Sequence, residues 1–286
     1  RYRDQIISEI PEVDLVFGTG SIPQVAERTR AFLEGERLES HVWCDIPDTV
    51  DYLDNNRVLS DGKPYAYLKI AEGCSNNCTY CIIPRLRGPF RSRPVESLLK
   101  EAEFLAQQGK KEIILIAQDV TRYGTDLYGE KKLVELIRSI SRVDGIQWIR
   151  LLYCYPELID DALIEEMKSN EKLVHYMDIP IQHISDRVLK AMGRRGSGEY
   201  IESLVKRLKT EIPDIVLRTS LIAGFPGETE EDHRQLEDFV KKGYFQHLGV
   251  FAYSREEDTP AYRMKNQVPA RVKTARRKAL MEIQRE

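Results

Sequence analysis

Six short apolar runs alternate with stretches of helical pattern from residue 65 onward, and this alternation limits the possible folds more than any other feature. The helical stretches repeat apolar residues every three or four positions, as an amphipathic helix requires. Strands that alternate with helices pair in parallel through right-handed crossovers. The predicted strands are 65–71, 112–118, 147–154, 175–181, 215–223 and 247–253, and the predicted helices are 95–108, 131–141, 158–168, 185–192 with 198–210, and 229–242.

Six such units are too few to close an eight-stranded barrel, so an open partial barrel or a doubly wound sheet remains. Both folds place their chemistry at the carboxyl ends of the strands. Polar clusters stand there in this chain. Three cysteines follow the first strand, Gln118 and Asp119 the second, Gln182 and His183 the fourth, and residues 224–228 the fifth. We expect these clusters to meet on one rim of the sheet.

The cysteines Cys74, Cys78 and Cys81 are separated by three and then two residues in a loop of small and polar side chains. Thiolates are soft ligands that hold iron–sulfur clusters. Gly73 gives the backbone freedom just before the loop. Three ligands instead of four would leave one iron of a 4Fe–4S cluster open for the amino and carboxylate groups of a cofactor. Electron transfer to a sulfonium bound there would produce a radical.

Other uses of the thiols remain to be weighed. A zinc site would need a fourth ligand, which Cys44 or His41 could supply, and a ferredoxin-like module would want four cysteines in a small domain. The five cysteines, three of them within eight residues, fit a disulfide framework poorly. They fit a cluster site in a reducing cytoplasm. Cys154, at a predicted strand end, is interpreted as a packing residue.

Charge and composition add weaker constraints. The formal net charge of −3 differs from the basic balance typical of a dedicated nucleic-acid-binding domain. The sequence contains no run of about 18 apolar residues of the kind that spans a membrane. Arg1 is not a natural start, so we interpret the chain as a piece of a longer protein, and the lack of a visible targeting segment says little.

The cysteine loop, with Tyr80 directly before its last cysteine, resembles the motif of the radical-SAM superfamily. The resemblance implies that the three cysteines hold a 4Fe–4S cluster whose open iron binds S-adenosylmethionine (SAM), and that Tyr80 lies near the adenine. Residues 222–229 (IAGFPGET) resemble the motif that follows the fifth strand in the same superfamily. That likeness implies that Ile222 and Gly224 support the adenine.

Residues 72–94 (EGCSNNCTYCIIPRLRGPFRSRP) closely resemble the methylthiotransferase family, whose members insert sulfur at an unactivated C–H bond and methylate it. The resemblance implies a six-stranded radical-SAM partial barrel between an N-terminal domain with a second cluster and a C-terminal TRAM domain. The implied divisions are a remnant of the N-terminal domain at 1–34, a linker at 35–62, the radical-SAM core at 63–268, and a helical lead-in to TRAM at 269–286. The second 4Fe–4S cluster is expected only in the full-length protein.

Three strand ends indicate the branch of this family. The chain has Gln118-Asp119 where the tRNA-modifying branch typically has Gln-Asn, and Tyr155-Pro156 where that branch has His-Pro. It also has a Gln-His-Ile sequence at 182–184 in place of Gln-Ser-Gly. The chain therefore resembles the RimO-type branch, which modifies the β-carbon of an aspartate in small-subunit ribosomal protein S-twelve. A tRNA (adenosine) methylthiotransferase is the alternative, and a non-enzymatic iron–sulfur scaffold is a distant third.

The RimO-type resemblance also implies partners. These are ribosomal protein S-twelve or the small ribosomal subunit, and an electron donor such as flavodoxin or ferredoxin. Contact with RNA is expected only through the TRAM domain, and the expected location is the cytoplasm, with no membrane association.

Several polar residues have both a functional and an ordinary interpretation. Gln118 and Gln182 would hydrogen-bond the ribose or methionine end of SAM, or form a satisfied polar rim. Arg218 would meet a carboxylate of SAM or of the substrate aspartate, or form an outward salt bridge. We name no catalytic side chain, and His175 and His183 receive no role.

Two groups of basic residues also have both a functional and an ordinary interpretation. Guanidinium groups close behind the cysteines would tune the cluster, grip a partner or be solvated. These are Arg85, Arg87, Arg91 and Arg93. The basic tail at 270–286 is interpreted as an amphipathic helix with a solvated face, or as the approach to a nucleic-acid-binding domain.

Overall fold

The six predicted strands form one parallel sheet whose spatial order follows the order of the chain. The computed structural model describes residues 2–46, 48–54, 57–59 and 62–286. The strands are β3 (Tyr65–Lys69), β6 (Glu112–Ile116), β7 (Trp148–Leu151), β8 (Leu173–Asp178), β9 (Val216–Ala223) and β10 (His247–Ala252). A doubly wound sheet reverses its strand order near the middle, whereas a barrel adds each strand beside the last. The order therefore identifies the open six-stranded partial barrel.

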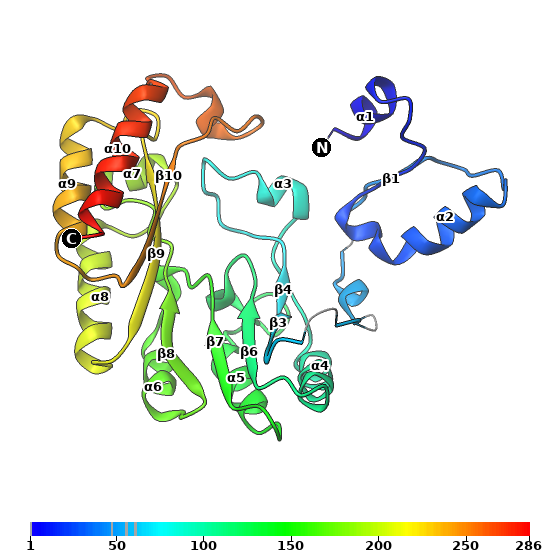
Figure 1. The fold of residues 1–286 in the computed structure, drawn as a ribbon, viewed down its shortest axis with the longest axis horizontal. Helices are drawn as coiled ribbons and strands as arrows, with labels where there is room; N and C mark the ends of the chain where they lie inside the picture. The colour runs from blue at the N-terminus through cyan, green and yellow to red at the C-terminus, as the bar shows by residue number, and fades with distance from the viewer. Residues whose placement is uncertain (1, 47, 55–56, 60–61) are drawn as a thin grey trace.

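Helices follow the strands and cover one face of the sheet, as Figure 1 shows for α8, α9 and α10. They are α4 (Val95–Gln107), α5 (Leu133–Ser141), α6 (Asp161–Ser169), α7 (Asp186–Ala191), α8 (Gly198–Glu211), α9 (Glu230–Val240) and α10 (Ala270–Ile283). Three of them begin at a side chain that caps the first turn: Asp160, Ser197 and Thr229 accept backbone N–H groups at the starts of α6, α8 and α9. These caps fix the starts of the three helices.

Strand β9 shows how the sheet separates its two faces. Its residues alternate strictly between buried and partly exposed. The buried set, which includes Leu217 and Leu221, faces the helices, and Arg218, Ser220 and Ile222 face the barrel interior, where all three line a cavity.

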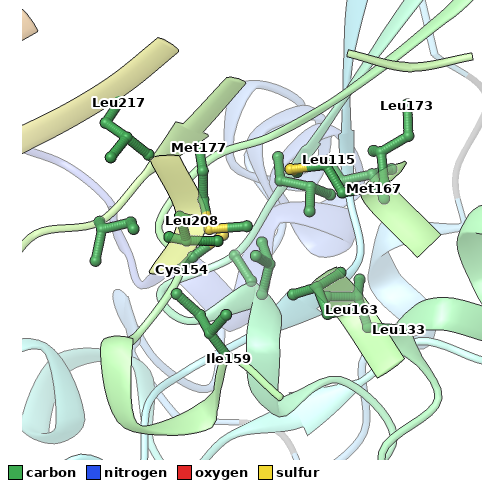
Figure 2. Close-up of a cluster of buried hydrophobic side chains, with 14 of the residues drawn as sticks. Leu115, Leu133, Cys154, Ile159, Leu163, Met167, Leu173, Met177, Leu208 and Leu217 are labelled. Atoms are coloured by element: carbon green, nitrogen blue, oxygen red, sulfur yellow. The ribbon is translucent and has the colours of Figure 1, made fainter. Parts of the chain in front are cut away.

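The core between sheet and helices contains Cys154. Its side chain is fully buried, and Figure 2 shows it near Met177, Leu208 and Ile159. Its amide donates to the carbonyl of Asp178 at 2.8 Å. The interpretation of Cys154 as a packing residue is therefore confirmed.

Short elements escape the periodicity argument. They are α1 (Arg3–Glu9), α3 (Ile83–Arg87), the antiparallel pair β4 (Ala71–Glu72) and β5 (Arg91–Ser92), and the 3-10 helices Thr19–Gln24, Asp51–Leu53, Val120–Arg122, Pro156–Leu158 and Pro260–Arg263. Each is too short to show a period. None of the helices in the described ranges is long and apolar enough to cross a membrane.

The N-terminal segment, drawn in blue in Figure 1, stands beside the barrel. It contains α2 (Val25–Leu33) and a parallel pair of β1 (Val16–Phe17) with β2 (Val42–Trp43), where the Phe17 and Trp43 rings stack at 5.1 Å. This pairing joins the predicted remnant (1–34) to the predicted linker (35–62). Residues 47, 55–56 and 60–61 of that linker, and Arg1, lie outside the described residues. The domain boundaries stay a prediction.

The burial of Cys154 makes a stability prediction. Replacing Cys154 by Ser puts an unpaired hydroxyl into an apolar site and is expected to lower the free energy of unfolding by about 1–3 kcal/mol. Cys154→Ala removes one atom and adds no polar group, so its loss should be smaller. Urea denaturation of the two variants beside the wild type measures the order, and an alanine variant less stable than the serine variant would contradict the packing role.

Candidate functional site

The polar clusters at the strand ends meet around one cavity of about 670 Å³. Its wall contains all three cysteines of the loop and five of the six residues expected to contact SAM. Those eight residues are Cys74, Cys78, Cys81, Tyr80, Gln118, Gln182, Arg218 and Ile222. The other lining residues are Lys69, Asn76, Ile83, Arg87, Ile116, Ala117, Tyr153, Tyr155, Pro180, Arg194, Ser220 and Phe251. Parallel pairing thus brings together side chains that are more than 170 positions apart in the sequence.

The cysteine loop is held against two neighbouring segments. Gly73 has φ +75°, and a Cβ there would lie 2.0 Å from the carbonyl oxygen of Pro89. The Cys74 amide donates to the carbonyl of Gly88 at 3.1 Å. On the other side, Thr79 donates from its amide to the Met192 carbonyl at 2.9 Å, just past the end of α7. The loop therefore has a fixed path, and only glycine fits at its start.

The thiols of this loop are partly exposed, and none of the three forms a disulfide with a described residue. Burial raises the pKa of the Cys74 and Cys81 thiols, and the nearby Asp119 carboxylate adds to the effect on Cys74. The protein alone therefore does not favour thiolates at these two positions. A metal that binds them supplies the charge that displaces the protons.

Two glutamines, one after β6 and one after β8, line the cavity. The Oε1 atom of Gln118 is buried and has no hydrogen-bond partner among the described residues. Gln182 has a backbone φ of +70°, which is unusual for a residue other than glycine. Its amide donates to the Ser220 carbonyl at 3.0 Å, and its carbonyl accepts the Ile222 amide of β9 at 2.8 Å. A buried acceptor without a hydrogen-bond partner and a strained backbone are both common where a ligand completes a site.

The aromatic side of the cavity is built by Tyr80. Its ring meets Phe225 edge to face at 6.5 Å between centroids. It packs against a small apolar cluster that includes Met192 and Tyr253. Burial raises the pKa of the Tyr80 phenol, and Cys78 adds to the increase. Tyr80 and Ile222 thus give part of the cavity an apolar surface.

Gly224 is the one expected SAM-contacting residue that is not among the described residues lining the cavity. It has φ +76°, and a Cβ there would meet the Lys273 side chain of α10 at 2.4 Å. Glu228 accepts the amides of Gly224 at 2.7 Å and Phe225 at 3.1 Å. The glycine is therefore required for this turn and for its close approach to α10.

The same carboxylate corrects the interpretation of the basic tail. Arg276 of α10 is buried and donates to Glu228 Oε1 at 2.9 Å. The prediction that this helix face is solvated is wrong for Arg276. Helix α10 packs on α9, β9 and β10, and the guanidinium of Arg276 lies in their interface. Arg271, Arg277, Lys278 and Arg285 are exposed as expected.

The four arginines that follow the cysteines in the sequence differ in burial and in their partners. Arg85 is exposed and pairs with Asp258 at 3.2 Å, whereas Arg87 lines the cavity and binds the buried Glu72 at 3.0 Å. The interpretation as solvated side chains is wrong for Arg91 and Arg93, because both are buried. Arg93 bridges Glu101 at 2.6 Å and Asp54 at 3.0 Å, so it joins α4 to the segment before the barrel.

The two histidines lie in separate hydrogen-bond networks. His175 contacts Asp214 at 2.7 Å and the Met167 carbonyl at 3.0 Å. His183 is fully buried, its Nδ1 accepts the Ser185 amide at 3.0 Å, and burial lowers its pKa to about 3. His183 is thus neutral near pH 7, and both side chains have structural partners.

Several cavity residues escaped the sequence argument. The Arg194 guanidinium, which is buried, lies over the Tyr155 ring at 3.9 Å and donates to the Pro180 carbonyl at 3.0 Å. Tyr153 and Phe251 keep 46% and 60% of their surface exposed, so the cavity mouth is aromatic. The strand-end position of Tyr153 was a usable signal, but nothing in the loop after α7 marks Arg194.

The residues offered for a zinc site belong to the N-terminal segment. The ring nitrogen of His41 lies 2.9 Å from the carbonyl of Asp14, and Cys44 follows β2, where its backbone packs against Gly18. Among the described residues, no three His, Cys, Asp or Glu side chains form a group that could hold a single metal ion.

Comparisons with known proteins agree with this geometry. The Radical SAM superfamily profile matches residues 68–240. The chain is 56% identical to a protein of Acetivibrio thermocellus named ribosomal protein uS12 methylthiotransferase RimO, over 100% of this chain and 64% of that protein. Proteins of the same name from Trichlorobacter lovleyi and Geobacter sulfurreducens are 52% and 53% identical, over 99% of the chain and 63% of their own lengths. The chain thus spans a little under two thirds of these relatives.

Solved structures share the fold. The radical SAM methyltransferase TsrM from Kitasatospora setae superposes with a TM-score of 0.57 at 22% identity, covering 69% of this chain and 38% of that one. Coproporphyrinogen III oxidase (HemN) from Escherichia coli gives 0.53 at 16% identity, covering 77% and 51%.

The close approach at Gly73 predicts a large effect of one methyl group. Gly109 is the matched control, because it also has positive φ (+80°) but nothing lies within 4 Å of its Cβ position. Gly109→Ala should cost only the backbone strain, about 1–2 kcal/mol, whereas Gly73→Ala should cost more because backbone atoms must also move. Urea denaturation compares the two, and equal losses would contradict the tight packing of the loop.

The buried neutral His183 predicts a pH dependence of stability. The unfolded chain protonates this ring below about pH 6.5, but burial keeps the folded ring neutral to about pH 3, so acid favours unfolding across that window. The loss is at most about 1.4 kcal/mol per pH unit. His183→Gln should flatten the decline by that amount in urea titrations at pH 7 and pH 5. Parallel curves for variant and wild type would show that another group is responsible.

Proposed function

Because the chain belongs to the radical SAM superfamily, we propose that it is the central part of a methylthiotransferase that modifies the β-carbon of an aspartate in ribosomal protein uS12. The observation that carries the proposal is the identity of 48–56% to relatives of that name along 98–100% of the chain. The strand-end residues at 118–119, 155–156 and 182–184 support the same branch. Modification of tRNA adenosine is the alternative that the experiment below separates.

The residues of the cavity fit a 4Fe–4S cluster with SAM. Cys74, Cys78 and Cys81 supply three soft ligands on one wall, and the orphaned Oε1 of Gln118 offers an acceptor to the ammonium or hydroxyl groups of the cofactor. When bound, the cluster supplies an electron for reductive cleavage of the SAM sulfonium.

The remaining wall residues would bind SAM and orient it. Tyr80 and Ile222 would cover the adenine with apolar surface. Gln182, fixed by its pairing to β9, would hold the ribose or methionine end. Gly224 would support the adenine through the turn that it allows, while its own backbone lies against Lys273 of α10. The aromatic mouth at Tyr153 and Phe251 limits the access of water to the reacting atoms.

The proposal includes parts beyond this chain. In the full-length protein a second cluster on the N-terminal domain and a C-terminal TRAM domain would flank residues 63–268, and a flavodoxin or ferredoxin would deliver electrons. The protein would work in the cytoplasm, where newly made ribosomal protein uS12 or the small subunit is available.

Cysteine substitutions test the proposed ligands. After anaerobic reconstitution this chain should bind about four iron and four sulfide ions and cleave SAM with dithionite. Changing any one of Cys74, Cys78 and Cys81 to Ala should remove most of the iron and all cleavage. Cys44→Ala is the control and should keep both. Stoichiometric zinc without sulfide would refute the cluster assignment.

The substrate is tested in a strain that lacks the full-length gene. Mass spectrometry of uS12 should lose the methylthio mass on its aspartate, and tRNA should keep its own methylthio modification. Loss of the tRNA modification with intact uS12 would overturn the proposed substrate.

A further inference from the structure

The charge of the cavity wall is one-sided. Four cationic side chains line it, namely Lys69, Arg87, Arg194 and Arg218, and none of the described residues that line it is Asp or Glu. A wall of this kind favours anionic groups in whatever binds there. The four cations differ, however, in how much of their hydrogen-bonding capacity is left for a ligand.

The other three cations lie elsewhere on the wall. Lys69 and Arg87 share the buried carboxylate of Glu72, directly before the Gly73 turn of the cysteine loop, and Arg87 reaches it through Nη1. Arg194 is buried against the Tyr155 ring and the Pro180 carbonyl, and its Nε has no partner among the described residues. These groups contribute charge to the cavity, but they are less exposed than Arg218.

Arg218 is the most exposed of the four cations. Its Nη1 donates to Asp178 Oδ1 at 2.7 Å, and its side chain remains 39% exposed. Among the described residues, no partner is found for its Nη2 and Nε atoms. Asp178 is itself buried and accepts the Tyr153 amide at 3.3 Å, so its carboxylate holds the guanidinium in a fixed position. The free edge of an anchored guanidinium is suited to bind one carboxylate in a bidentate manner.

The position of Arg218 separates it from the adenine. Arg218 and Ile222 face the same side of β9 and are four residues apart, which corresponds to about 13 Å along a strand. Ile222 is beside the glycine turn at the carboxyl end of β9, whereas Arg218 pairs in register with Asp178, the last residue of β8. In the proposed complex the methionine carboxylate of SAM binds the open iron beside the cysteines, so a carboxylate at Arg218 would come from a second molecule.

We infer that Arg218 binds the side-chain carboxylate of the substrate aspartate and thereby determines the specificity for an acidic residue. The inference rests on the proposed function and deepens it, because it names the residue that selects the substrate. An asparagine of the same shape would lose the charge and would point an N–H group at a donor. Discrimination against it should be about tenfold or more.

The test uses the full-length protein with its clusters reconstituted and two synthetic peptides of uS12. One peptide carries the target aspartate, and the other carries asparagine in its place. The KM of the first, the inhibition constant of the second and the Kd of SAM are measured. The wild type should prefer the aspartate peptide at least about tenfold, and Arg218→Gln should reduce this preference to near one, with the Kd of SAM unchanged within about twofold.

Three further variants keep the test decisive. Arg218→Gln leaves the buried Asp178 unpaired, so the double variant Asp178→Asn with Arg218→Gln removes that charge and should fold with the same lost preference. Arg218→Lys keeps the charge without the fork and should give an intermediate preference. Arg150→Gln is the matched control, because Arg150 pairs with Glu112 at 2.5 Å on the neighbouring part of the sheet and is not among the described cavity residues. It should keep the full preference.

Two outcomes overturn the inference with the proposed function intact: a preference that persists in the folded Arg218 variants, or a weakened Kd of SAM with no change in preference. A wild-type protein that modifies tRNA and neither binds nor modifies the aspartate peptide overturns both. A purely structural role for Arg218 would change both peptides alike and leave their ratio at the wild-type value.

Discussion

Four buried carboxylates at the strand ends hold the loops around the cavity, and each has a cation beside it. Glu72 accepts the Gly73 amide, Glu228 accepts the amides of the glycine turn, Asp178 accepts the Tyr153 amide, and Asp119 binds Asn76 of the cysteine loop. The cations are Arg87, Arg276, Arg218 and Arg122 in the same order. A buried carboxylate without partners would be costly, so each pair keeps its loop in one conformation. The positions of the thiols and of the cavity residues follow from these anchors.

Strand periodicity was enough to predict the sheet and its active rim, because the run from β3 to β10 repeats one simple pattern. It also placed Gln118 and Gln182 on the same rim as the cysteines, since parallel strands must end at the same edge. Arg218 lies within β9, where the pattern alone left its direction open, and its side chain lines the cavity. The open barrel could not be separated from a doubly wound sheet in this way. That distinction depends on which strands become neighbours, and local pattern does not encode it.

The cavity residues that remained hidden depend on tertiary contacts. Arg194 reaches the site because the end of α7 packs under the cysteine loop through Thr79 and Met192. Arg276 lies 48 positions from its partner Glu228, and no local signal connects them. Gly224 is predicted to support the adenine through its backbone, and its missing Cβ also makes room for Lys273 of α10. A glycine motif indicates that space is needed, and only the fold reveals which neighbour uses it.

The composition of the wall favours anionic groups in this cavity. None of the four carboxylates is among the described residues that line the cavity, whereas two of their cations, Arg87 and Arg218, line it. Each carboxylate holds its cation in place and removes part of its charge, so the field in the cavity is positive but moderate. A cluster on three thiolates carries negative charge and SAM contributes a carboxylate, and both are compatible with such a field. Arg218 is the most exposed of the cations on the wall, and Asp178 binds only its Nη1, which leaves the rest of the guanidinium for a carboxylate that arrives with the substrate.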